Sequence, residues 1–179
     1  MVKIMKTMIL FILISSLSMC MSCCSKMFPD AELSMQRVNY TGNELRTDGY
    51  YFRQEAEYNR TLAMFLFRNG VVLSARAYWS LDLSIVESEM IQRYNTIRND
   101  KMGWGVFLIT DNQILIEQWN ASTGYSLPIM RRKGYIENDT TFRITETYYS
   151  DIKKTEYKEF IWHFKQFSPK PDSTNVFIK

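Results

Sequence analysis

The chain has 179 residues, the length of one ordinary domain, and its 46% hydrophobic and 15% aromatic residues supply enough apolar mass for a packed core. This composition excludes a disordered chain. Two of the positive charges behind the formal net charge of +3, Lys3 and Lys6, precede the first apolar run, so the rest of the chain is nearly neutral and lacks the basic face that nucleic acid requires.

Residues 1–22 have the organisation of an export signal. Lys3 and Lys6 form a short positive region, and an apolar run extends from Met8 to Leu17. That run is shorter than the roughly 20 apolar residues of a membrane-spanning helix, whereas it is typical of a secretory signal peptide. The alternatives are a buried N-terminal helix and a retained anchor helix.

All three cysteines follow this run, at Cys20, Cys23 and Cys24, and the rest of the chain has none. Adjacent cysteines make a poor disulfide pair, and the only histidine, His163, is too distant in sequence to suggest a zinc site. The segment resembles a bacterial lipoprotein signal, in which a small residue precedes the acylated cysteine. Ser22 makes Cys23 the predicted lipid attachment site, with Cys20 as the alternative and Cys24 third.

This resemblance implies an export segment at 1–22, a lipid-anchored tether at 23–44 and a folded domain at 45–179. Acyl chains such as palmitate on the cysteine would provide stable anchoring, since each buried methylene contributes about 0.8 kcal/mol. The expected partner is therefore a membrane, and the expected location is the cell envelope, at the outer membrane.

Strand signals begin after the tether. We predict strands at 50–52, 61–67 and 71–79, with a type I′ hairpin at Asn69 and Gly70 because both residues tolerate positive φ. Residues 84–100 have helical spacing of apolar residues, and Ser84 with Glu87 fits a capping box. Further strands are predicted at 104–110, 114–119, 125–131, 141–149 and 158–167.

About eight short strands joined by tight turns, with one inserted amphipathic helix, indicate a mainly β fold. We predict an antiparallel meander that closes into an up-and-down barrel, because closure removes exposed edge strands. An eight-stranded barrel is either filled by side chains or holds one small ligand, and the sequence leaves both alternatives open.

Several segments of this domain are similar to a known family. Leu45-Arg-Thr-Asp-Gly-Tyr-Tyr-Phe, Phe67-Arg-Asn-Gly, Trp104-Gly-Val-Phe and Ile136-Glu-Asn-Asp-Thr-Thr-Phe resemble the small lipocalin-like lipoproteins of Bacteroidetes. The resemblance covers Leu45 to Lys179 and implies a lipocalin-like barrel at the cell envelope. It implies no catalytic residues.

No set of residues in the sequence predicts catalysis, a cofactor or a metal. His163 shares a strand face with Glu159 and Lys165, which is typical of a solvated surface. Glu87 and Glu89 are two apart on a helix and do not face each other. The chain is therefore predicted to be non-enzymatic.

Arg131-Arg132-Lys133 is the one compact basic run. We interpret it as a solvated strand end that needs no partner, with contact to anionic lipid or glycan as the alternative.

The aromatic residues are the remaining functional signal, because ligand pockets favour apolar and aromatic linings. The predicted pocket lining is Phe65, Phe67, Trp104, Trp119, Phe142 and Trp162. The leading hypothesis is a binding module for a small apolar ligand or envelope component. The alternative is a structural or assembly lipoprotein that binds a protein partner through its surface helix.

Overall fold

The computed structural model describes residues 29–75, 77–121 and 126–179. The predicted export signal at 1–22 and the candidate lipid-bearing residues Cys20, Cys23 and Cys24 lie outside the described residues.

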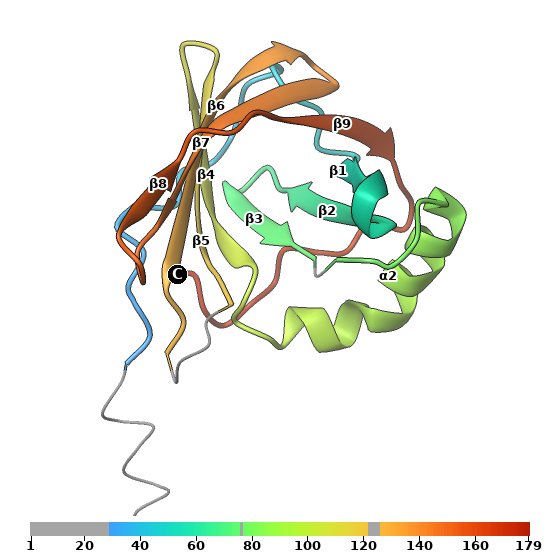
Figure 1. Ribbon diagram of the computed structural model, residues 1–179, viewed down its shortest axis with the longest axis horizontal. Helices are drawn as coiled ribbons and strands as arrows, with labels where there is room; N and C mark the ends of the chain where they lie inside the picture. Colours follow the sequence, from blue (N-terminus) through green and yellow to red (C-terminus); the bar gives the residue numbers. More distant parts are fainter. Residues whose placement is uncertain (1–28, 76, 122–125) are drawn as a thin grey trace, which may run out of the picture.

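The described chain forms an antiparallel barrel with one helix inserted between β3 and β4 (Figure 1). Each strand from β1 to β7 pairs with the next, and β9 lies between β7 and β1 and closes the ring. A short strand, β8, pairs with β7 alone and lies outside the ring. The strands are β1 (Gly49–Glu55), β2 (Arg60–Leu66), β3 (Val71–Ser74), β4 (Trp104–Thr110), β5 (Gln113–Trp119), β6 (Ile129–Asn138), β7 (Thr141–Tyr149), β8 (Lys154–Glu156) and β9 (Phe160–Gln166).

The predicted eight-stranded up-and-down barrel with one helix is confirmed, and individual strand bounds differ from the prediction. β3 ends at Ser74, and only an isolated bridge between Thr61 and Tyr78 continues its pairing. β6 runs to Asn138, seven residues beyond the predicted end at Arg131. The basic run Arg131-Arg132-Lys133 therefore lies within a strand, where successive side chains point to opposite faces of the sheet.

The β2–β3 hairpin turn differs in type from the prediction. At the β2–β3 turn only Gly70 has positive φ, 78°, and the Gly70 N–H donates to the Phe67 carbonyl at 2.9 Å. The predicted type I′ turn is wrong there, because that turn needs two consecutive residues of positive φ. The β4–β5 turn has this geometry instead, with φ of 48° at Asp111 and 65° at Asn112.

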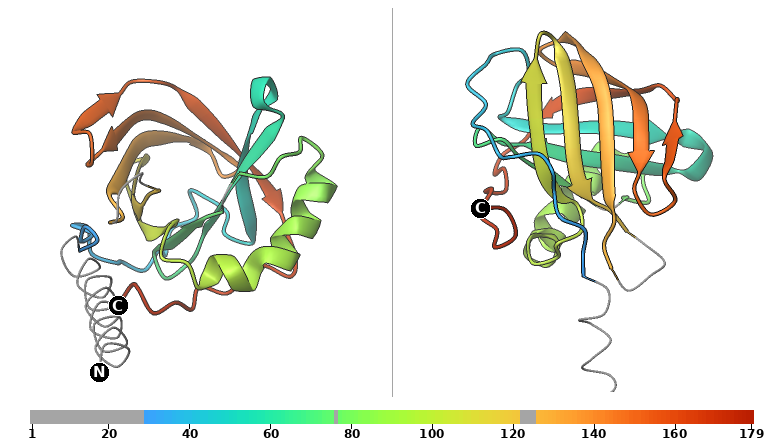
Figure 2. Two further views of the ribbon diagram at one scale, coloured as in Figure 1. Left: turned by 60° about the horizontal axis from the view of Figure 1, so that its bottom comes forward. Right: turned by 90° about the vertical axis from the view of Figure 1, so that its left-hand side faces the viewer.

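Helix α2 (Leu83–Arg98) packs outside the barrel, as Figure 2 shows in its left view. Its N-cap is Asp82, whose carboxylate accepts a hydrogen bond from the Ser84 N–H at 2.8 Å. The predicted Ser84–Glu87 capping box is therefore wrong, because the N-cap lies two residues earlier than Ser84. Val86 and Met90 are its buried residues. The Glu87 carboxylate instead accepts a hydrogen bond from the Tyr50 hydroxyl at 3.0 Å and pairs with Lys165, which ties the helix to β1 and β9.

Alternation along the strands separates two hydrophobic clusters. The inner cluster lies inside the barrel and includes Tyr51, Met64, Phe107, Phe142 and Trp162 among its buried residues. The outer cluster lies between the barrel wall, α2 and the terminal segments, and its buried residues include Tyr50, Phe65, Phe67, Trp104 and Trp119. Two separate cores explain why this chain carries so many aromatic residues.

The predicted tether is bound to the barrel over its described part, residues 29–44, which runs along the barrel wall in the right view of Figure 2. The Ala31 N–H donates to the Leu127 carbonyl at 3.0 Å, and the Trp119 indole N–H donates to the Ala31 carbonyl at 2.7 Å. Further along, Ser34 and the Met35 N–H donate to the Glu117 carboxylate. Glu117 is fully buried on the outer face and also pairs with Arg131 at 2.6 Å.

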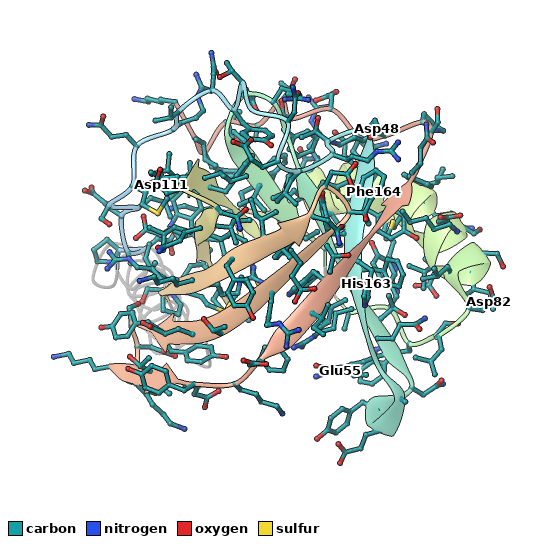
Figure 3. All side chains as sticks on the ribbon, turned by 90° about the horizontal axis from the view of Figure 1, so that it is seen from above. Asp48, Glu55, Asp82, Asp111, His163 and Phe164 are labelled. Carbon is teal, nitrogen blue, oxygen red and sulfur yellow. The ribbon has the colours of Figure 1, made fainter. Side chains whose placement is uncertain are left out.

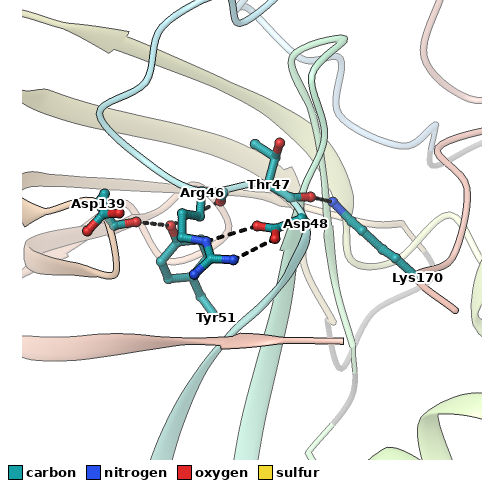
Figure 4. Close-up of polar contacts among 6 residues, drawn as sticks. All are labelled: Arg46, Thr47, Asp48, Tyr51, Asp139 and Lys170. Carbon is teal, nitrogen blue, oxygen red and sulfur yellow. Dashed lines mark hydrogen bonds and ion pairs between the residues drawn. The ribbon is translucent and has the colours of Figure 1, made fainter. Parts of the chain in front are cut away.

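The terminal segments seal one end of the barrel (Figure 4). The Tyr51 hydroxyl lies 3.1 Å from the Arg46 carbonyl oxygen and 3.0 Å from that of Asp139. Lys170 reaches in from the C-terminal segment, and its ammonium donates to the carbonyls of Thr47 and Leu66. The same nitrogen lies 4.4 Å from the centre of the Phe67 ring. Burial lowers the pKa of Lys170 to about 8 from its ordinary value of 10.5.

We expect this lysine to make stability depend on alkaline pH. The unfolded chain binds more protons than the folded chain between pH 8 and the ordinary lysine pKa, so the free energy of unfolding should rise with pH across that window. Above about pH 10 the buried tyrosines oppose this rise, because burial raises the pKa of Tyr50, Tyr51 and Tyr78.

Denaturant unfolding at a series of pH values measures the effect, expected at about 1–3 kcal/mol. Lys170→Met should remove the rise, whereas Lys133→Met, at an exposed position on β6, should leave it in place. If the free energy of unfolding of Lys170→Met still rises with pH, a titratable group other than Lys170 causes the rise.

Candidate functional site: the barrel cavity

A cavity of about 680 Å³ occupies the barrel opposite the sealed end. Its lining comes from the ends of β1, β3, β5 and β7 and from the starts of β2, β6 and β9, so it opens where these strands connect. The apolar part of the lining is Leu62, Ala63, Ala75, Ala77, Met102, Gly103, Trp119, Ala121, Met130, Ile144, Phe160 and Trp162.

Incomplete pairing of β9 widens the barrel at this end. β9 pairs with β1 only from Gly49 to Phe52, and with β7 only from Thr141 to Ile144. The remaining halves of β1 and β7 therefore diverge beyond the start of β9. Arg53 and Tyr149, which both line the cavity, lie on these two diverging halves.

The polar part of the lining is cationic. It comprises Arg53, Arg60, Ser74, Gln118, Asn120, Thr147, Tyr149 and Arg132, and among the described lining residues none is an aspartate or a glutamate. A cavity that is open to a ligand and carries only positive formal charge favours an anionic group over a cationic one.

Arg132 is the most buried of these cations, with 8% of its surface exposed. Its terminal nitrogen Nη2 donates to Ser74 Oγ at 3.2 Å and to Gln118 Oε1, while Nε has no hydrogen-bond partner in the described chain. No carboxylate of the described residues forms an ion pair with it. A buried guanidinium without a counter-charge is costly, because burial removes its hydration.

Arg53 projects into the cavity from β1. It pairs with Glu55, and Glu55 also pairs with Arg60, so one carboxylate is shared by two arginines. Arg53 Nε has no hydrogen-bond partner among the described residues. Its guanidinium carbon lies 3.7 Å from the centre of the Phe160 ring. The Arg53 and Arg132 guanidinium carbons each lie 5.7 Å from the centre of the Trp162 ring.

Burial lowers the pKa of both arginines. The pKa of Arg132 falls to about 10, chiefly because its charged form is desolvated and further because Arg53 is nearby. Burial also lowers the pKa of Arg53, whereas the nearby Glu55 carboxylate acts to raise it. An arginine side chain stays protonated in proteins, so both remain charged at neutral pH. Glu55 pairs with Arg53, whereas Arg132 has no ion pair among the described residues.

The structure brings two of the six predicted pocket residues to the cavity. Trp162 lines it from the inner cluster, and Trp119, a member of the outer cluster at the end of β5, lines it at the open end of the barrel. Phe142 lies inside the barrel against Trp162, with ring centroids 6.0 Å apart and planes 8° apart. Phe65, Phe67 and Trp104 belong to the outer cluster beneath α2 and the terminal segments.

The residues considered for catalysis lie elsewhere. His163 is exposed on β9, and its ring lies near that of Phe52 at 6.1 Å, while its neighbour Phe164 packs against Tyr51 inside the barrel (Figure 3). Glu87 pairs with Lys165, and Glu89 pairs with Arg93 on the same helix. Within the described residues no group of three or more His, Cys, Asp or Glu side chains could hold a metal ion.

Arg132 is the buried cation of the cavity that the sequence did not reveal. The interpretation of Arg131-Arg132-Lys133 as a solvated strand end is wrong for its central member, because β6 continues through it. Arg131 and Lys133 point outward and are exposed, whereas Arg132 points inward and is buried. The signal that could have revealed this is the alternation from Arg132 through Gly134 to Ile136, all on the inner face.

We expect opposite stability changes from replacing the two adjacent arginines. Arg132→Met should raise the free energy of unfolding by about 1–2 kcal/mol, because it removes a buried charge that lacks a counter-ion, although Gln118 loses a hydrogen bond. Arg131→Met should lower it by about 2–4 kcal/mol, because it leaves Glu117 buried without its cation. Urea unfolding at constant m-value measures both. Equal destabilisation by the two changes would show that Arg132 is compensated within the protein.

Comparison with known proteins identifies no relative: no family model matches the chain, and no curated protein or solved structure matches it significantly. No helix in the described part of the chain is both long and apolar enough to cross a membrane. The chain is an eight-stranded antiparallel up-and-down β-barrel, consistent with a lipocalin-like architecture, with a cavity at one end.

Proposed function

We propose that this chain is a non-enzymatic, lipid-anchored lipoprotein of the lipocalin-like type, which binds a small apolar ligand or envelope component inside its barrel. The observation that carries the proposal is the cavity of about 680 Å³. Its volume lies in the range of about 300–1,000 Å³ that is typical of small-molecule sites.

The division of the barrel interior supports a binding role. The sealed end is packed with large side chains such as Tyr51, Phe107 and Phe142, so this sequence has residues that can fill a barrel. The other end has smaller residues at lining positions, including Ser74 and Ala77. An apolar ligand in that space would gain the dispersion contacts that the surrounding walls lack when it is empty.

The course of the described N-terminal segment is compatible with anchoring through Cys23. Asp30 is held beside the cavity, where it pairs with Lys101 at 2.8 Å and accepts a hydrogen bond from the Leu127 N–H. Six residue steps separate Cys23 from Pro29 and span at most about 20 Å when extended. An acyl group on Cys23 would therefore keep the cavity close to the bilayer of the outer membrane.

The alternative function, assembly with a protein through α2, is supported by two exposed isoleucines on that helix, Ile85 and Ile91. They lie six positions apart and so point in different directions around the helix axis. The cavity is the larger and more specific feature, so ligand binding is the preferred function.

Ligand binding can be tested with N-phenyl-1-naphthylamine, an uncharged fluorescent probe. The full-length anchored protein in lipid nanodiscs should show saturable binding above the background of empty nanodiscs. Met130→Trp should weaken this binding by about 10-fold or more, because it places an indole in the cavity. Ile91→Trp, which adds the same ring at an exposed position on α2, should bind as the unchanged protein does.

The absence of any saturable component in the unchanged protein would reject the binding function. In that case, loss of a co-purifying protein partner after the double change Ile85→Ser and Ile91→Ser would favour the assembly function instead.

Anchoring is tested by mass spectrometry of the mature N-terminus. A chain that begins at acylated Cys23 is expected, and Cys23→Ser should release the protein from the membrane fraction. An intact Met1 without acyl groups would contradict both the location and the anchor. Acylation at Cys20 would move the attachment site but retain the anchored module.

A further inference from the structure

We propose that the cavity binds the carboxylate of an amphiphilic ligand, with Arg132 as the residue that contacts it and Arg53 as a second cationic wall. This inference rests on the proposed binding function and names the ligand class for the same site.

The hydrogen bonding of Arg132 is incomplete. A guanidinium has five N–H donors arranged in a planar fork that matches the two oxygens of a carboxylate. Arg132 uses Nη2 for Ser74 and Gln118, whereas the buried Nε has no partner in the described chain. Arg132 is only 8% exposed and still lines the cavity, so its guanidinium has few acceptors for its five N–H groups. A ligand oxygen beside the part of the guanidinium that lines the cavity would add an acceptor.

Arg131, the neighbour of Arg132 in the sequence, has the ion pair that Arg132 lacks within the described chain. Arg131 is exposed and nevertheless has a buried carboxylate, Glu117, at 2.6 Å. Arg132 is buried and has none among the described residues. The two adjacent arginines therefore have opposite environments. Arg132, the buried one without a counter-ion in the described chain, is the one that faces the cavity.

The polar groups around Arg132 come from neighbouring strands of the barrel. Arg132 on β6, Thr147 on β7 and Arg53 on β1 belong to strands that follow one another around the ring, with β9 between β7 and β1. Thr147 is the direct cross-strand neighbour of Arg132. Trp162 on β9 lies within 5.7 Å of both guanidinium carbons, measured from its ring centre. Two guanidinium groups thus lie near one indole ring, and Thr147 neighbours one of them.

The apolar part of the cavity lining fits an apolar ligand body. Leu62, Ile144, Met130 and Phe160 provide apolar wall beside the arginines. A simple inorganic anion would leave this wall uncovered, and an alkylammonium would meet uncompensated positive charge. A carboxylate attached to an apolar body satisfies both parts of the lining.

Four compounds with the same nine-carbon chain test the head group without any change to the protein. Nonanoate, its methyl ester, nonylammonium and nonyl phosphate would each be titrated calorimetrically into the full-length protein in nanodiscs, with empty nanodiscs subtracted. The affinity for nonanoate should be at least about 10-fold higher than for the methyl ester, because the ester cannot form the charge-assisted hydrogen bonds of the carboxylate. Nonylammonium should show no saturable binding.

Variants assign the preference to Arg132. Arg132→Gln should reduce nonanoate affinity to that of the methyl ester, and methyl ester affinity should change by less than about two-fold. Arg132→Lys should retain part of the preference, since it keeps the charge but loses the fork. Arg37→Gln, at an exposed arginine outside the cavity, is the matched control and should have no effect.

Each other outcome overturns a defined part of the account. Equal affinity for nonanoate and its ester would reject the carboxylate site while the binding function stands. Tighter binding of nonyl phosphate than of nonanoate would replace the carboxylate with a phosphate ligand. Failure of all four compounds to saturate would reject the binding function itself.

Discussion

Closure of the sheet by β9 is the constraint on which the rest of the structure depends. Its C-terminal half pairs with β1 and its N-terminal half pairs with β7. This pairing turns Phe160, Trp162 and Phe164 toward the barrel interior and leaves His163 outside. Because β9 reaches only halfway along each neighbour, the same strand closes the ring and leaves it wide at the cavity end. Arg53 and Arg132 then both lie near the Trp162 ring.

The interior combines two physical solutions to the problem of filling a barrel. At the sealed end, large rings and aliphatic side chains pack directly, and the terminal segments cover them through Tyr51 and Lys170. At the other end, smaller side chains and cations leave a space of ligand size. The cost of burying Arg132 there is a loss of stability that packing alone does not require. A functional site is the usual reason for a protein to retain such a cost.

Much of the fold follows from local chemistry that is visible in the sequence. The two strands predicted at 104–110 and 114–119 lie close to the observed β4 and β5. The bounds of β6 were not predictable in the same way, because a run of three basic residues resembles a solvated end until its pairing with β5 and β7 is known. Similarly, Asp82 rather than Ser84 caps α2, so the N-cap lies two residues earlier than the capping-box pattern suggested.

The candidate site was less predictable than the fold. Aromatic content indicated a pocket, but two hydrophobic clusters compete for the same residue types, and sequence does not assign Phe65 or Trp104 to one of them. The inward direction of Arg132 depends on the register of β6, which only the assembled barrel defines.

The central claim is that the buried charge of Arg132 exists to meet an acidic ligand. The most direct measurement is the identification of small molecules that remain bound when the protein is isolated from its own membrane under non-denaturing conditions. Mass spectrometry of the released compounds should find one acidic amphiphile per chain, absent from the Arg132→Gln protein. An exclusively neutral or cationic ligand, retained equally by both proteins, would contradict the account.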